Sequence, residues 1–309
     1  MQIGIIEPNG FSNKAVKKIS NIGSIEFFDN KNLRLFLNDK EIIFIRLKYY
    51  IGKNFLDLSK ELKYICTPTT GLNHIDLDEC IKRDIKIISL KGEHEFLSTI
   101  RATPEHTFGL VLALLRKYKT AFLSKNNDKW DRDKYKGFEL FENKIGIIGF
   151  GRVGKILSKY FKAFDAKVYF YDIDGSVQSV NDAIKASSIV ELVDKTNVII
   201  LCASYTEGKT DEFDKKFIDL LKNKYFINTA RGELLDESYL IKKIKEGYFK
   251  GIAIDVIQSE QSKDNNLKQF LRLVETNNFI VTSHIAGATF GSMHRTEEFI
   301  ADKLIIERT

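Results

Sequence analysis

The sequence predicts an α/β protein with two doubly wound parallel-sheet domains, the second larger than the first. Short apolar runs typical of strands alternate with helix-like stretches along the 309 residues, and this order favours parallel sheets covered by helices. One apolar run leads directly into a glycine-rich turn, GFGRVG, at Gly149–Gly154. A chain of this length holds about two average domains. We therefore expect a smaller, discontinuous domain over residues 1–101 and 286–309, and a larger one over 102–285.

The composition excludes several classes of protein. The net charge of +6 comes from 48 basic and 42 acidic residues, and because the lysines are spread over helix-like stretches they indicate solvated helix faces more than a nucleic-acid site. No apolar stretch approaches the ~20 residues that span a bilayer, and the first residues lack the regions of a signal peptide, so we expect a cytoplasmic protein without a membrane partner. The three cysteines have no CxxC spacing, which argues against a disulfide framework and a metal site.

The first hundred residues predict a small flavodoxin-like domain. Strands are expected at residues 2–7, 24–28, 41–47, 64–67 and 85–89, with helices near 13–21, 33–37, 55–62 and 77–83. Ligands in such sheets bind beyond the carboxyl ends of the strands. Arg46 and Lys48 follow one apolar run, and a loop with Gly71 follows another, where backbone N–H groups suit a carboxylate. Solvated charges and an ordinary turn are the alternatives.

Residues Lys144–Asp172 carry the pattern of a dinucleotide-binding βαβ unit. In the GxGxxG spacing, Gly149 allows a tight turn, Gly151 lets the backbone approach a pyrophosphate, and Gly154 lets the next helix lie close to the sheet. The N–H groups at the start of that helix favour a bound anion. Asp172, 23 residues after Gly149, suits the ribose hydroxyls of NAD and would repel the 2′-phosphate of NADP. An ordinary strand-to-helix turn is the alternative.

A long apolar helix is expected before this unit, and a second helix closes the chain. Thr103 as N-cap and Pro104 at the first helical position mark the start of the first helix. Its apolar residues lie on several faces, which places it at a domain interface or a subunit contact. We interpret His106, near its start, as a structural histidine. The last helix, over 290–307, could return to the first domain.

Three later strands end in polar motifs, among strands expected at residues 198–203, 225–228, 252–256 and 279–282. The motifs are INTARGELLD with Arg231, AIDVIQSE with Asp255 and Glu260, and IVTSHIAGAT with His284. In a doubly wound sheet they would gather at the edge where a nicotinamide lies. Hydride transfer from a hydroxy acid needs a base with a pKa near neutrality, and a histidine oriented by a carboxylate meets that need. Taken singly, Arg231 could be an interdomain ion pair, Glu260 a loop charge and His284 a turn residue.

Together with GFGRVG, TTGLNHID and TPEHTFGLVLALLR, the order and spacing of these motifs resemble the D-isomer-specific 2-hydroxyacid dehydrogenases over nearly the whole chain. The resemblance implies an NAD-dependent oxidoreductase with a Rossmann domain for the cofactor and a smaller substrate domain. It matches Arg231 to the arginine that holds the carboxylate and carbonyl of the substrate. It matches His284 to the acid/base, and Glu260 to the carboxylate on the other imidazole nitrogen.

The same resemblance implies the remaining contacts. Cofactor contacts are expected from the glycine loop and the strand ends, namely Gly149, Gly151, Arg152, Val153, Gly154, Asp172, Thr206, Thr229, Ala230, Asp255 and Gly287. Within this set, Asp255 matches the contact to the nicotinamide carboxamide. Substrate contacts are expected from the carboxylate loop and a distal anion position, namely Thr69, Thr70, Gly71 and Arg46. The family also implies a homodimer formed through the cofactor domain.

Several alternatives stay open. A nucleotide-sensing scaffold, like the C-terminal-binding corepressors that share these motifs, would bind NAD(H) without needing His284. Use of NADP is disfavoured by Asp172. The last helix leaves no room for a regulatory amino-acid-binding domain, so feedback of that kind is not expected. The expected partner is a small 2-hydroxy or 2-keto acid, and Arg46 with Lys48 favours a phosphorylated or sugar-derived one, like 3-phosphoglycerate, over lactate or glyoxylate.

Overall fold

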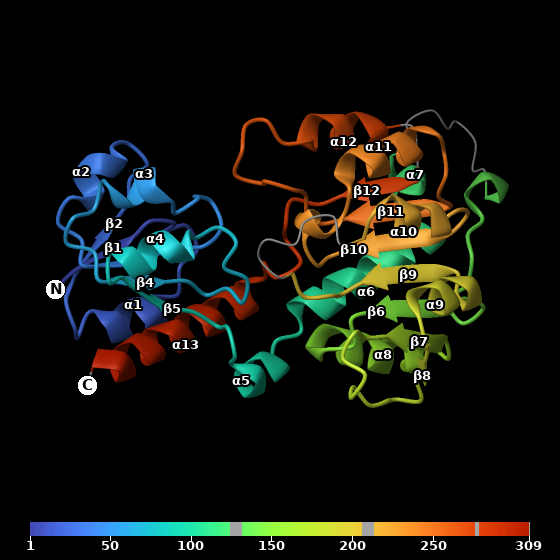
Figure 1. Cartoon of the computed structure of the whole chain (residues 1–309), viewed down its shortest axis with the longest axis horizontal. Helices are drawn as coiled ribbons and strands as arrows, with labels where there is room; N and C mark the ends of the chain where they lie inside the picture. Colours follow the sequence, from blue (N-terminus) through green and yellow to red (C-terminus); the bar gives the residue numbers. More distant parts are fainter. Residues whose placement is uncertain (124–131, 206–212, 276–277, 309) are drawn as a thin grey trace. The chain divides into compact units, whose positions relative to one another are not determined.

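The computed structural model describes residues 1–123, 132–205, 213–275 and 278–308. The chain divides into two compact units, each with its own parallel sheet (Figure 1). Unit 1 comprises Met1–Ile100 and Ala288–Thr309, and unit 2 comprises Arg101–Gly287. The boundaries expected from the sequence differ from these by one residue at the first crossing and by two at the second.

Unit 1 contains a five-stranded sheet in the order β2-β1-β3-β4-β5, and all its pairings are parallel. This is the flavodoxin-like order, in which the chain changes direction between β1 and β3. The predicted flavodoxin-like architecture is therefore confirmed. The strands are β1 (Gln2–Ile5), β2 (Ser24–Phe27), β3 (Ile42–Phe44), β4 (Tyr64–Cys66) and β5 (Lys86–Ile88).

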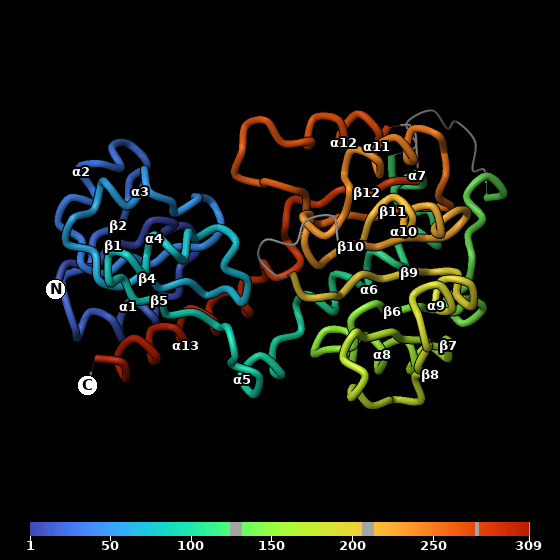
Figure 2. Tube along the Cα trace, in the orientation of Figure 1, coloured from blue at the N-terminus to red at the C-terminus, as the bar shows by residue number. Residues whose placement is uncertain are grey.

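The helices of unit 1 include one from the far end of the chain. They are α1 (Asn13–Ile19), α2 (Leu33–Leu37), α3 (Lys53–Leu56), α4 (Leu77–Lys82), α5 (His94–Ser98) and α13 (Phe290–Arg308). Figure 2 shows α13, in red, returning to lie beside α1. Phe299 on α13 stacks on Phe96 with 4.0 Å between ring centroids, and Lys18 on α1 pairs with Asp302 at 2.6 Å. The final helix therefore completes the core of the first unit.

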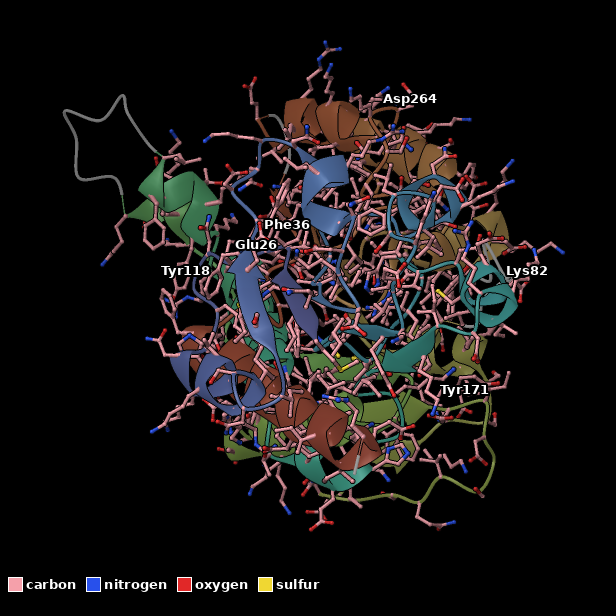
Figure 3. All side chains as sticks on the ribbon, turned by 90° about the vertical axis from the view of Figure 1, so that its left-hand side faces the viewer. Glu26, Phe36, Lys82, Tyr118, Tyr171 and Asp264 are labelled. Carbon is pink, nitrogen blue, oxygen red and sulfur yellow. The ribbon has the colours of Figure 1, made fainter. Side chains whose placement is uncertain are left out.

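A buried lysine supports one edge of this sheet. The Lys40 side chain is only 1% exposed, and its Nζ atom lies 2.7 Å from a carboxylate oxygen of Glu26 and 5.1 Å from the centroid of the Phe36 ring. Figure 3 labels these two partners, on β2 and α2. Because a charge this deep needs partners, the contacts of Lys40 with Glu26 and Asp39 explain why the lysine is tolerated there.

Unit 2 contains a seven-stranded parallel sheet in the order β12-β11-β10-β9-β6-β7-β8. Counted from β6, this is the Rossmann order 3-2-1-4-5-6 with one more strand added, and the direction changes between β6 and β9. The predicted Rossmann domain is thus confirmed. The strands are β6 (Lys144–Ile148), β7 (Lys167–Tyr171), β8 (Ile184–Lys185), β9 (Val198–Leu201), β10 (Tyr225–Asn228), β11 (Gly251–Ile254) and β12 (Phe279–Val281).

Helices cover both faces of this sheet because its strands are apolar on both sides. Along β9, Val198 and Ile200 enter one core with residues of α6 and α8, whereas Ile199 and Leu201 enter the other with residues of α9 to α12. The helical segments are α6 (Ala102–Leu115), α7 (Tyr118–Phe122), η1 (Asp133–Tyr135), α8 (Arg152–Ala163), α9 (Ile189–Lys195), α10 (Lys215–Leu220), η2 (Gly232–Leu234), α11 (Glu237–Lys245) and α12 (Leu267–Val274). Of the helices described, none is long and apolar enough to cross a membrane.

Helix α6 begins two residues earlier than its sequence suggests. It starts at Ala102 with Arg101 in the N-cap position, so the expected N-cap Thr103 lies inside the first turn. Pro104 still fits there, because N–H groups of the first turn have no partner within the helix. The apolar residues of the helix pack in the core of unit 2.

Candidate active site

The glycine loop of unit 2 has the shape that a pyrophosphate requires. Gly149 has a φ of +87°, and a Cβ atom on it would lie 2.6 Å from the amide nitrogen of Ala203. A Cβ atom on Gly154 would lie 2.6 Å from the carbonyl oxygen of Gly149. At Gly151, by contrast, no described atom lies within 4 Å of the same position. The loop is closed on its inner side and open where an anion would approach the start of α8.

Two charged residues flank this loop. The Asp172 carboxylate accepts hydrogen bonds from the N–H groups of Phe150, at 2.6 Å, and Asp174, at 3.0 Å, so it is fixed against the loop at the end of β7. Arg152 opens α8, and burial together with the nearby charge of Arg101 lowers the pKa of its guanidinium. Cationic groups at a helix N-terminus fit the phosphates of a dinucleotide, and Asp172 fits its ribose. Of the cofactor contacts expected nearby, Val153 follows Arg152 in α8, whereas Thr206 lies outside the described residues.

His284 and Glu260 meet at the carboxyl edge of the sheet. The Nδ1 atom of His284, which follows β12, lies 2.7 Å from Oε2 of Glu260, which follows β11. Both side chains are 24% exposed. Because a carboxylate accepts, Nδ1 of His284 carries the hydrogen of this contact. The other ring nitrogen, Nε2, is then the one that can take up or release a proton.

Asp255 clamps the turn that carries His284. Its backbone carbonyl accepts from the N–H of His284 at 2.7 Å, and its carboxylate accepts from the N–H groups of Ile285 and Ala286 at 2.9 and 2.8 Å. Burial raises the pKa of the Asp255 carboxyl, but the nearby polar hydrogens of His106 and Thr282 and the two N–H groups outweigh burial and lower that pKa overall. The structure thus gives this residue a structural task besides the expected carboxamide contact.

Arg231 lies at the same edge, in the loop that follows β10. One Nη atom donates to the carbonyl oxygen of Ala230 at 2.7 Å, and Asn228 pins the loop by bonding Ala230 and Arg231 with its side-chain amide. Burial lowers the pKa of the Arg231 guanidinium, while the charges of Glu260 and Glu233 act in the opposite direction. Glu260 therefore acts on both the guanidinium and the imidazole, and the three predicted catalytic side chains gather at one edge.

The loops that carry Arg231 and Glu260 are in direct backbone contact. A Cβ atom on Gly232 would lie 2.0 Å from the carbonyl carbon of Ile257 and 2.3 Å from the amide nitrogen of Gln258. That N–H in turn donates to the buried carboxylate of Glu237. Only glycine permits this approach, so the position of one loop fixes the position of the other.

Several contacting residues at this edge were not among the predicted site residues. Thr107 on α6 bonds the predicted cofactor contact Thr229 through their hydroxyls at 2.8 Å. His106 and Thr282 bond one another at 3.2 Å. The nearest atom to a Cβ on Gly287 would be the Thr103 hydroxyl, at 4.0 Å. The polar residues of the TPEHT and VTSH motifs indicate that such contacts are possible. The sequence does not show which residues pair, because the partners lie more than 100 positions apart.

In unit 1 the predicted anion contact Arg46 is already bound. Its Nε atom donates to Oε1 of Glu297 at 2.9 Å, its Nη2 atom donates to the same oxygen, and its Nη1 atom donates to the carbonyl oxygen of Asn9 at 2.9 Å. Glu297 is fully buried and also accepts from the N–H of Ser12. Arg46 therefore forms an internal ion pair with Glu297, which joins the end of β3 to α13. The sequence alone could not show this, because α13 brings the glutamate from the far end of the chain.

The predicted carboxylate loop follows β4. The Thr69 hydroxyl donates to the carbonyl oxygen of Gly71 at 2.9 Å and lies 3.0 Å from the Thr67 hydroxyl. Thr70, between them, is exposed. These bonds hold the loop in one shape at the carboxyl end of the strand, where ligands of such sheets bind.

Comparisons with known proteins give one family. A model described as "D-isomer specific 2-hydroxyacid dehydrogenase, NAD binding domain" matches residues 108–286. The glyoxylate reductase of Thermofilum pendens is 30% identical over 276 residues, which are 87% of this chain and 78% of that protein. The D-3-phosphoglycerate dehydrogenase of Methanocaldococcus jannaschii is 27% identical over 296 residues, 94% of this chain but only 54% of that protein.

A solved structure agrees with these sequence relatives. The D-lactate dehydrogenase of Aquifex aeolicus, complexed with NAD and lactic acid, matches with a TM-score of 0.82 and 26% identity, and the match covers 100% of this chain and 95% of that one. The open glycine loop and the acid at the end of β7 fit the same cofactor. This chain therefore belongs to the D-isomer-specific 2-hydroxyacid dehydrogenases and is an NAD-dependent oxidoreductase.

Proposed function

We propose that the enzyme interconverts a D-2-hydroxy acid and its 2-keto acid with His284 as the acid/base and Arg231 as the substrate anchor. The observation that carries this proposal is the 2.7 Å contact between Nδ1 of His284 and Glu260. The glycine loop and Asp172 would hold NAD⁺, which would supply the hydride acceptor for C2. The hydroxyl proton passes to Nε2 of His284 as the C2–O bond becomes a carbonyl, and reduction runs through the same atoms in reverse.

Charge explains the roles of the two neighbouring residues. The imidazolium that forms on His284 is stabilised by the Glu260 carboxylate. Arg231 offers a planar fork of donors, which suits a carboxylate and the adjacent carbonyl, and it polarises that carbonyl toward hydride attack. Without the guanidinium of Arg231, no group in this proposal would orient the carboxylate of the substrate or polarise its carbonyl.

We further propose that the substrate carries no phosphate. The expectation of a phosphorylated acid depended on Arg46 and Lys48, yet Arg46 is bound to Glu297, and the Nζ atom of Lys48 donates to Asn30 at 2.8 Å. The partly buried carboxylate of Glu7 also accepts from the N–H of Arg46 at 2.7 Å. Two carboxylates thus balance the two cations, which leaves no excess positive charge to hold a dianion.

A keto-acid panel tests the reaction and the substrate together. Glyoxylate, pyruvate, hydroxypyruvate and phosphohydroxypyruvate are offered with NADH, and the loss of absorbance at 340 nm is followed. We expect turnover of an unphosphorylated acid with kcat/KM at least about tenfold above that for phosphohydroxypyruvate, a difference of about 1.4 kcal/mol. Faster turnover of phosphohydroxypyruvate would contradict the substrate proposal. NADH binding without turnover of any acid would instead favour the nucleotide-sensing scaffold.

We propose that the enzyme is a homodimer formed through unit 2. Exposed apolar side chains lie on the segment that follows α6, where Phe122 at the end of α7 is 79% exposed and Leu123 is 63% exposed. Phe138, also exposed, is tied to this place by its N–H bond to the carbonyl oxygen of Leu115. Apolar groups clustered in this way are expected to be covered by another protein surface.

Replacing Phe122 by aspartate is expected to shift the molar mass in solution from twice the chain mass of 35.5 kDa to that mass. A buried aspartate would lack a partner in the dimer contact, which makes the contact unfavourable. Light scattering after size-exclusion chromatography at micromolar protein concentration measures the molar mass. Ile81→Asp, at an equally exposed position in unit 1, is the control and should remain dimeric. A monomeric parent enzyme, or a dimeric Phe122→Asp variant, would refute the proposed contact.

A further inference from the structure

A chain of hydrogen bonds at the edge of unit 2 reaches the His284 turn from α6. The Nε2 atom of His106 lies 3.2 Å from the hydroxyl oxygen of Thr282, and that hydroxyl donates to Oδ1 of Asp255 at 2.5 Å. A threonine hydroxyl has one hydrogen to donate, and here Thr282 donates it to the carboxylate of Asp255. The hydroxyl must therefore accept from His106, so Nε2 of His106 carries a hydrogen. The same Nε2 atom lies 3.5 Å from the Asp255 carboxylate.

Asp255 depends on donors supplied by the protein. The residue is 1% exposed, so its carboxylate charge is satisfied by the hydroxyl of Thr282 and the N–H groups of Ile285 and Ala286. A buried carboxylate that loses a donor costs more than an exposed one, because water does not replace it. The donor that His106 orients therefore affects how firmly the carboxylate is held.

The turn that Asp255 holds is strained. His284 has a φ of +52°, in the left-handed region that residues other than glycine rarely adopt. Its N–H bonds the backbone carbonyl of Asp255, and the next two N–H groups bond the carboxylate of the same residue. A strained turn persists only when its surroundings fix it, and Asp255 supplies three of these bonds.

Helix α6 links two parts of the site through adjacent residues. Thr107 bonds Thr229 in the loop that leads to Arg231, and His106 bonds Thr282 next to the His284 turn. The hydroxyl of Thr107 also donates to the carbonyl oxygen of Thr103. Two adjacent residues in one turn of α6 therefore contact both strand-end loops.

We propose that His106 is a positioning residue of the reaction assigned above, acting through Thr282 and Asp255 on the turn that presents His284. This inference rests on the proposed function of His284. His106 contacts none of the predicted catalytic side chains among the described bonds. Its role differs from simple packing, because packing needs only volume whereas positioning needs a donor at Nε2.

Two substitutions separate these roles. His106→Gln keeps an N–H donor near the position of Nε2, whereas His106→Leu keeps volume and removes the donor. We expect kcat for the preferred keto acid to fall about tenfold or more in His106→Leu and to stay within about threefold of the parent in His106→Gln, with the affinity for NADH little changed in both. Equal losses in the two variants, or no loss in His106→Leu, would overturn the proposal.

Hydrogen exchange gives a readout that needs no activity. The amides of Ile285 and Ala286 should exchange about tenfold faster in His106→Leu than in the parent, and at the parent rate in His106→Gln. Unchanged exchange in His106→Leu would overturn the proposal even if the protein has another function. Faster exchange in a protein without turnover would show that His106 holds the His284 turn, but would reject the reaction and with it the catalytic role of that turn. Thr282→Val should reproduce the His106→Leu result, and the double variant should lose nothing further, because both changes break one chain of bonds. Additive losses would contradict it.

Discussion

Replacing His284 by alanine is expected to lower kcat/KM for the preferred keto acid by about a thousandfold. The imidazole is the predicted acid/base of the site, and a positioned acid/base contributes about 10² to 10⁴ in rate. Stopped-flow absorbance at 340 nm measures the reaction, and fluorescence titration measures NADH binding, which should change little because the glycine loop and Asp172 are untouched.

His94→Ala is the matched control for this substitution. His94 is an exposed histidine at the start of α5 in unit 1, and its loss should leave kcat/KM within about twofold of the parent value. Glu260→Gln should show an intermediate loss, since an amide cannot stabilise the imidazolium as a carboxylate does. A His284→Ala variant that keeps a tenth or more of the activity would rule out the assigned acid/base.

Gly232→Ala is expected to lower kcat/KM by about a hundredfold and to reduce the thermal stability of the enzyme. The added Cβ would lie 2.0 Å from the carbonyl carbon of Ile257 and 2.3 Å from the amide nitrogen of Gln258, and backbone atoms cannot move aside as a flexible side chain can. The two loops must separate, which moves Arg231 away from Glu260, and misplacement by about 1 Å can cost about 10²-fold in rate.

Gly175→Ala provides the control for this change. Gly175 also belongs to unit 2, and no described atom lies within 4 Å of the position that its Cβ would take. Its kcat/KM and melting temperature should match those of the parent. If Gly232→Ala behaved in the same way, the two loops would not be coupled as the backbone contact indicates.

Sequence reasoning succeeded where structure is decided locally. The spacing of Gly149, Gly151 and Gly154 predicted a strand, a tight turn and a helix, because each glycine serves a steric need within a few residues. The parallel order of both sheets also followed from the alternation of strands and helices. The gathering of Arg231, Glu260 and His284 followed from their positions at the ends of parallel strands, since such ends share one edge, although their catalytic roles stay predictions.

The sequence could not predict contacts between side chains that are distant along the chain. Arg46 was expected to hold a substrate anion, yet α13 supplies Glu297 as its partner. His106 was interpreted as a structural histidine, and only the fold shows that it bonds Thr282 beside Asp255. The beginning of α6 was also misplaced, because the Thr–Pro pair fits the first helical turn as well as its cap. In each case tertiary packing decided between local alternatives of similar cost.

The most direct test of the account is a crystal structure of the enzyme with NADH and oxamate, an analogue of a keto acid that the cofactor does not reduce. We expect Nε2 of His284 to lie about 2.6 to 3.2 Å from the oxygen that represents the keto group, with Nδ1 still on Glu260. Arg231 should hold the carboxylate of the analogue with two nitrogen atoms. An analogue bound with its keto oxygen away from His284, or with its carboxylate on groups other than Arg231, would contradict the proposed chemistry.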